Sequence, residues 1–142
     1  MPEKIKVALV GLGNCFSGLI QGIEYYSKNP SQKVTGIIHE NLRDYTIHDI
    51  DFVAGFDVGA NKVGKPINDA IYESPNMVNW IDKNDMPKAN GNVYESPALD
   101  GVGIWVENKV KPIESGKSES ELREEIIKVL KETGTEIIVS YL

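Results

Sequence analysis

The sequence predicts an α/β fold built on a parallel β-sheet, and three observations support that class. Residues Ile5 to Val10 form a short run that is apolar on both faces, as in a strand buried inside a parallel sheet. A turn at 11–13 with two glycines follows, and then apolar residues spaced three and four apart, as in an amphipathic helix. Similar buried-strand runs recur at 51–56 and 135–142. We therefore expect a Rossmann-type, doubly wound parallel sheet.

The first predicted helix begins at Asn14 or Cys15, with Asn14 as its cap, and ends near Tyr26. The third glycine of the strict dinucleotide-binding fingerprint is absent, because Phe16 occupies that position. We expect Gly18 to provide the close contact between helix and strand instead. A strand, a glycine turn and a helix in this order place free backbone N–H groups at a helix N-terminus, where a pyrophosphate binds.

The glycine turn has a functional and a purely structural interpretation. Gly11 would form the tight turn, and Gly13 would let the backbone approach a phosphate closely. An ordinary turn without a ligand is the alternative. The side chain of Asn14 would point toward a bound phosphate or ribose. Cys15 invites assignment as a nucleophile, but we favour a small residue packed under a cofactor, because free cysteines are usually buried.

Asp57 follows the second predicted strand and is the candidate ribose ligand. An acidic residue there accepts both adenosine ribose hydroxyls, and no arginine lies immediately beyond it to neutralise a 2′-phosphate, so the sequence favours NAD over NADP. The usual spacing from the glycine turn is about 20 residues, and the connection over 32–51 explains the longer spacing here. A helix N-cap is the structural alternative for Asp57. His39 and His48 in that connection have no carboxylate partner in register, so we do not expect them to bind a metal.

The sequence pattern predicts fewer helices and strands in the second half of the chain. A short helix is expected after Pro66 and a short strand at 93–94. Ser118 and Glu121 match a capping box before a helix that ends near Gly134. A sheet of this type needs further strands beyond the one at 135–142, so we expect the fold to be incomplete at the C-terminus.

Composition fits one soluble globular domain over all 142 residues, of which 41% are hydrophobic and 25% charged. The net charge of -6 and the lack of a basic run argue against nucleic acid or a membrane surface as a partner. No apolar stretch reaches the ~18 residues that span a bilayer. Cys15 is the only cysteine, and the N-terminus leaves no room for a signal peptide, so we expect a cytoplasmic protein.

Several separated blocks of the sequence resemble the prokaryotic and archaeal type of myo-inositol-1-phosphate synthase. The blocks are 10–15, 21–26, 51–58, 62–65, 99–103 and 138–142. Relative to that family, the sequence stops less than halfway. The resemblance implies that residues 1–142 are the NAD-binding part of an inositol-3-phosphate synthase of inositol and phospholipid biosynthesis.

The family's reaction converts glucose 6-phosphate into 1L-myo-inositol 1-phosphate. The resemblance implies that NAD⁺ oxidises C5, that the resulting enolate at C6 closes the ring on C1 in an aldol step, and that NADH returns its hydride. It also implies a homotetramer, and it leaves open whether a divalent metal assists the aldol step. The family's catalytic lysines lie in its second half, so catalytic residues are expected beyond Leu142 and residues 1–142 alone are expected to be inactive.

The resemblance carries over only cofactor-binding residues: Gly11, Gly13, Asn14 and Cys15 at the pyrophosphate turn, Asp57 at the ribose, and Ser140 with Tyr141 near the nicotinamide. The sequence leaves a second hypothesis open. A stand-alone module that senses NAD(H) and regulates a partner without catalysis would have a suitable length, because function depends on sites rather than on folds.

Overall fold

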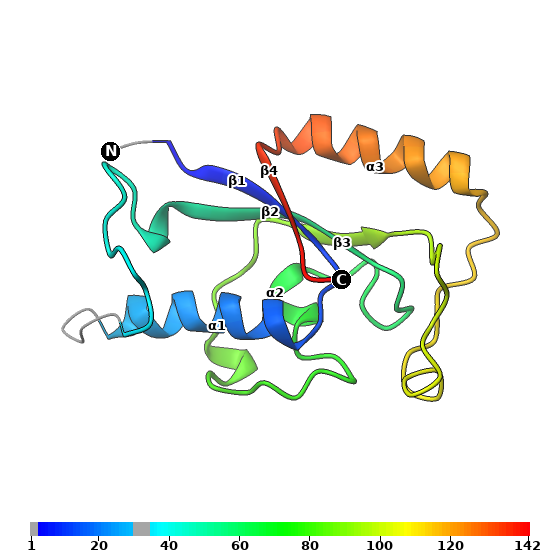
Figure 1. Ribbon diagram of the computed structural model, residues 1–142, viewed down its shortest axis with the longest axis horizontal. Coiled ribbons are helices and arrows are strands. Elements are labelled where there is room, and N and C mark those ends of the chain that lie inside the picture. The colour runs from blue at the N-terminus through cyan, green and yellow to red at the C-terminus, as the bar shows by residue number, and fades with distance from the viewer. Residues whose placement is uncertain (1–2, 30–34) are drawn as a thin grey trace.

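The sheet is parallel throughout and doubly wound. The computed structural model describes residues 3–29 and 35–142. Its four strands are β1 (Ile5–Val10), β2 (Ile50–Asp57), β3 (Asn92–Glu95) and β4 (Ile137–Ser140). They pair in the order β3-β2-β1-β4, so the chain begins at an inner strand and builds the sheet outward in both directions. Figure 1 shows this arrangement, which confirms the predicted α/β class.

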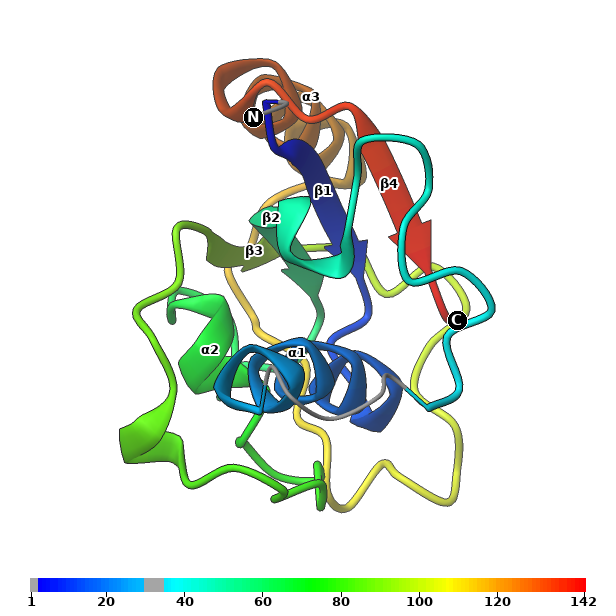
Figure 2. The same ribbon diagram turned by 90° about the vertical axis from the view of Figure 1, so that its left-hand side faces the viewer.

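Helices cover both faces of the sheet. α1 (Asn14–Lys28) and the single turn of α2 (Ile67–Ala70) lie on one face, and α3 (Glu119–Thr133) lies on the other (Figures 1 and 2). Alternation along β1 explains the two layers, because successive side chains of a strand point to opposite faces. Val7 and Leu9 pack with Phe16 of α1, whereas Ala8 packs with Val129 of α3.

The predicted ends of α3 are confirmed. The hydroxyl of Ser118 accepts a hydrogen bond from the backbone N–H of Glu121, and the carboxylate of Glu121 accepts one from the backbone N–H of Ser118. This is the reciprocal capping box. Gly134 ends the helix with a φ of 66°, in the left-handed region that glycine adopts without strain.

Two local expectations for α1 are wrong. Its N-cap is Gly13, and Asn14 is the first helical residue and forms no cap. Gly18 does not contact a strand. A Cβ at Gly18 would lie 3.6 Å from the ring of Trp80, so the close contact there is with a loop.

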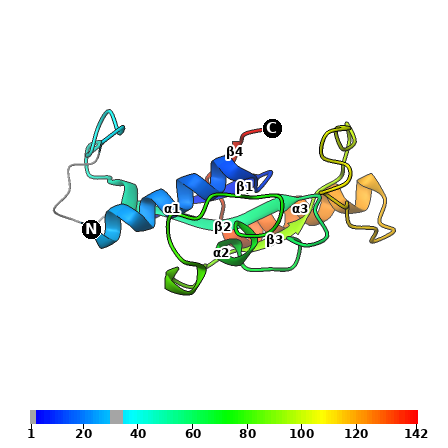
Figure 3. The same ribbon diagram turned by 90° about the horizontal axis from the view of Figure 1, so that it is seen from below.

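β4 pairs with β1 in parallel, but it is not the buried strand that the apolar run at 135–142 predicts. It is an edge strand, and Ile137 and Ile138 are 46% and 55% exposed. The expected long connection is present over its described part and includes a short 3₁₀ helix, η1 (Ile47–Asp49). Residues 32–34 of it lie outside the described residues. From 35 onward it lies beyond the C-terminal end of α1, far from the N-terminal end of that helix (Figure 3).

The segment between α2 and β3 is irregular apart from a second 3₁₀ helix, η2 (Lys83–Asp85). Among residues 3–29 and 35–142, no helix has the length and apolar character needed to cross a membrane.

Candidate functional site

A cavity of about 400 Å³ lies where all four strands end. Its lining includes residues that directly follow or end each strand: Gly11 and Gly13 after β1, Asp57 and Gly59 at β2, Ser96 after β3, and Tyr141 after β4. Ligands of open α/β sheets bind in the crevice outside the carboxyl ends of the strands, where the strand order reverses. The cavity has that position, because β1 continues to β2 on one side while β4 joins on the other.

The glycine turn forms the floor of this cavity. Gly11 has a φ of +77°, and its N–H donates to the carbonyl of Phe56 at 2.8 Å. The first helical hydrogen bond of α1 runs from the N–H of Ser17 to the carbonyl of Gly13, so the N–H groups of residues 14–16 have no intrahelical acceptor. Among the described residues, no atom lies within 4 Å of the position that a Cβ would take at Gly13. The turn therefore leaves room for a close ligand.

Asp57 is hydrogen-bonded to this turn through its side chain. One carboxylate oxygen accepts from the backbone N–H of Leu12 at 2.8 Å, and the other accepts from the N–H of Gly59 at 2.8 Å. The residue is only 9% exposed. The alternative assignment of Asp57 as a helix N-cap is wrong, because residues 60–64 form turns rather than a helix.

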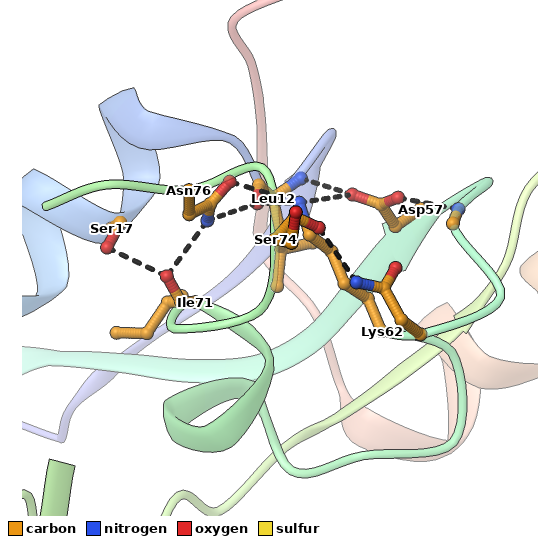
Figure 4. A network of polar contacts seen from close by, with 9 residues as sticks. Leu12, Ser17, Asp57, Lys62, Ile71, Ser74 and Asn76 are labelled. Atoms are coloured by element: carbon orange, nitrogen blue, oxygen red, sulfur yellow. Dashed lines mark hydrogen bonds and ion pairs between the residues drawn. The ribbon is translucent and has the colours of Figure 1, made fainter. Parts of the chain in front are cut away.

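Lys62 is a residue of the candidate site that the sequence analysis did not assign. Its ammonium donates to the carbonyl of Leu12 at 2.7 Å and to the side-chain oxygen of Asn76 at 3.2 Å, and lies 3.8 Å from the carboxylate of Asp57 (Figure 4). Burial lowers the pKa of Lys62, and the charges of Asp57 and Glu73 oppose part of that lowering. The ion pair with Lys62 compensates the negative charge of Asp57.

The loop after α2 closes against the glycine turn. The amide of Asn76 donates to the carbonyls of Leu12 at 3.0 Å and Ile71 at 2.9 Å. The side-chain oxygen of Asn14 accepts from the backbone N–H of Met77 at 2.7 Å, which is what its side chain does in place of capping α1. The hydroxyl of Ser17 donates to the same Ile71 carbonyl (Figure 4). The glycine turn, the first turns of α1 and the loop after α2 are thus joined by hydrogen bonds.

Five of the seven residues expected to bind the cofactor line the cavity: Gly11, Gly13, Asn14, Asp57 and Tyr141. Tyr141 also packs on the ring of Phe16, with centroids 4.5 Å apart. Cys15 and Ser140 do not line it. Cys15 is exposed, and its expected packing under a cofactor stays a prediction.

The two histidines lie outside the cavity lining. The Nδ1 atom of His48 lies 3.0 Å from the hydroxyl of Ser27, and His39 is exposed. Within the part of the chain that the structure describes, no three His, Cys, Asp or Glu side chains come together as metal ligands would.

Comparison with known proteins finds sequences similar to this chain. No protein-family model matches the chain. The inositol-3-phosphate synthases of Mycolicibacterium smegmatis and Mycobacterium tuberculosis H37Rv are 39% and 38% identical to it over 140 residues, 98% of the chain. That of Corynebacterium glutamicum is 39% identical over 144 residues. The chain spans 36% of the length of each of these relatives.

Two solved structures share the fold. The protein Ari2 superposes with a TM-score of 0.75 at 26% identity, covering 99% of this chain and 39% of its own. A myo-inositol-1-phosphate synthase-related protein from Thermotoga maritima gives a TM-score of 0.70 at 21% identity, covering 98% and 34%. Over 98% of its own length, the chain is therefore similar in sequence to inositol-3-phosphate synthases, of which it spans about a third.

Proposed function

We propose that residues 1–142 are the NAD-binding part of an inositol-3-phosphate synthase. The observation that carries this proposal is the cavity at the carboxyl ends of all four strands, with the glycine turn at its floor and Asp57 beside it. The names of the relatives support the choice of reaction.

The residues present fit a dinucleotide. The open space at Gly13 and the N–H groups of residues 14–16 suit a pyrophosphate, because the N-terminus of a helix attracts negative charge. Each carboxylate oxygen of Asp57 accepts one backbone hydrogen bond and has a second lone pair for a ribose hydroxyl. Tyr141 would line the nicotinamide side. When bound, NAD⁺ supplies a hydride acceptor that is regenerated within the reaction.

For the whole protein we propose the conversion of glucose 6-phosphate into 1L-myo-inositol 1-phosphate in the cytoplasm. The relatives are much longer than the matched segment, so residues that hold the sugar phosphate and transfer protons are proposed to lie outside residues 1–142. Assembly into a homotetramer belongs to the same proposal, which leaves open whether a divalent metal assists the aldol step.

Titration calorimetry tests the cofactor assignment. NAD⁺ should bind to one site on the protein, NADP⁺ should bind more weakly, and adenosine without a pyrophosphate should bind more weakly still. Equal affinities for NAD⁺ and adenosine would contradict a pyrophosphate site at the glycine turn.

A further inference from the structure

The peptide group of Leu12 is bound by side chains on both sides. Its N–H donates to Asp57, and its carbonyl accepts from both Lys62 and Asn76. The side chain of Leu12 is fully buried, so the residue is also held by packing. Because Leu12 lies between Gly11 and Gly13, these contacts fix the conformation of the whole turn.

Lys62 is the unusual member of this set. Among the described residues it is the one lysine or arginine that is buried, with 5% of its surface exposed. Removing an ammonium from water is costly unless acceptors replace the water. Two hydrogen bonds and the ion pair with Asp57 provide that replacement, and one of the acceptors is the turn itself.

The second acceptor extends the effect of Lys62. By donating to the side-chain oxygen of Asn76, the ammonium orients that amide so that its NH₂ group faces the carbonyl of Leu12. Lys62 therefore acts on Leu12 both directly and through Asn76 (Figure 4).

We propose that Lys62 is the positioning residue of the glycine turn: it holds the carbonyl of Leu12 so that the N–H groups after Gly13 face the cavity. This inference rests on the proposed NAD site. If Lys62 only neutralised Asp57, replacing it would change the stability of the fold alone. If Lys62 positions the turn, replacing it also changes the environment of Leu12 and the affinity for the cofactor in molecules that are still folded.

The test compares Lys62→Met with Lys65→Met. Lys65 lies on the same segment, but its ammonium pairs with Glu73 at 2.7 Å on the surface and does not contact the turn. At a temperature where all three proteins are folded, Lys62→Met should weaken NAD⁺ binding about tenfold, as expected for one lost charge-assisted hydrogen bond. Lys65→Met should bind like the wild type. Wild-type affinity in folded Lys62→Met would overturn the inference.

A readout without the cofactor separates this inference from the proposed function. The backbone carbonyl ¹³C and amide ¹⁵N resonances of Leu12 should shift in Lys62→Met and not in Lys65→Met. If the wild type does not bind NAD⁺, the proposed function fails, and these resonances still decide the role of Lys62. Unchanged Leu12 resonances in Lys62→Met would overturn the inference that Lys62 positions the turn.

The wild type provides the test if Lys62→Met does not fold. The carbonyl resonance of Leu12 should then titrate as the pH is raised, with a midpoint below 10.5, because burial lowers the pKa of its donor Lys62. Asp57 and Glu73 are the charged groups that face this ammonium. A carbonyl resonance that does not respond in that range would overturn the inference.

Discussion

The carboxylate of Asp57 and the backbone N–H of Leu12 are 2.8 Å apart, so the end of β2 is hydrogen-bonded directly to the turn that follows β1. The two residues are 45 positions apart in the sequence. The glycine turn and the acidic residue are therefore parts of one unit, and a change in either is expected to affect the other.

The wild type is expected to prefer NAD⁺ over NADP⁺, and Asp57→Ala should reduce that preference. A ribose hydroxyl donates a hydrogen bond to the carboxylate, whereas a 2′-phosphate offers mainly acceptors. The same change should lower the free energy of unfolding by about 3 kcal/mol, because it leaves Lys62 buried without its partner. Calorimetry with both cofactors and denaturant unfolding measure the two effects. Asp100→Ala, a change at an exposed residue that lines the same cavity, is the control, and equal wild-type affinities for the two cofactors would contradict the assignment.

Gly13→Val should abolish NAD⁺ binding and leave the fold intact. The new side chain would fill the space proposed for the pyrophosphate, and it meets no described protein atom within 4 Å of its Cβ. Gly22→Val is a matched control, because Gly22 also has open space around its Cβ position and does not line the cavity. Unchanged affinity in Gly13→Val would mean that the turn has only a structural role.

Stability is expected to depend on pH through Lys62. Its pKa is lowered by burial from the ordinary 10.5, so between the lowered pKa and 10.5 the unfolded chain binds more protons at this site than the folded protein does. The free energy of unfolding contributed by Lys62 therefore rises with pH across that window, and below it the full penalty for burying the ammonium is present. Denaturant unfolding at a series of pH values should show this rise in the wild type and in Lys65→Met. A rise of the same size in Lys62→Met would assign it to other groups.

Residues 1–142 alone should not produce inositol phosphate from glucose 6-phosphate and NAD⁺. Catalysis on a sugar phosphate needs cations close to the phosphate and the developing enolate. Lys62 is the one lysine or arginine among the described residues that lines the cavity, and its ammonium already binds Leu12 and Asn76. A product assay with the synthase of Mycolicibacterium smegmatis as positive control measures this. Turnover above background would show that catalytic groups lie within these residues.

Local patterns in the sequence were sufficient to predict much of this fold. The apolar run before Gly11 and the spaced apolar residues after it define β1 and α1, and Ser118 with Glu121 defines the start of α3. These signals act within a few residues, so they are visible without a structure.

The two candidate site residues that the sequence analysis did not assign depend on long-range packing. Lys62 and Asn76 meet Leu12 across 50 and 64 positions, and no local pattern marks either of them. Ser140 does not line the cavity because of strand alternation. Val139 and Tyr141 lie on the α1 side of the sheet, so Ser140 between them points to the other face.

The most direct test of the account is a titration of the ¹⁵N-labelled protein with NAD⁺, followed by the backbone amide resonances. Saturable shifts should appear at Gly11, Gly13, Asn14 and Gly59, which line the cavity at the ends of β1 and β2. Resonances that do not respond to NAD⁺, or that shift only in the groove between β3 and α3, would contradict a dinucleotide site at the glycine turn.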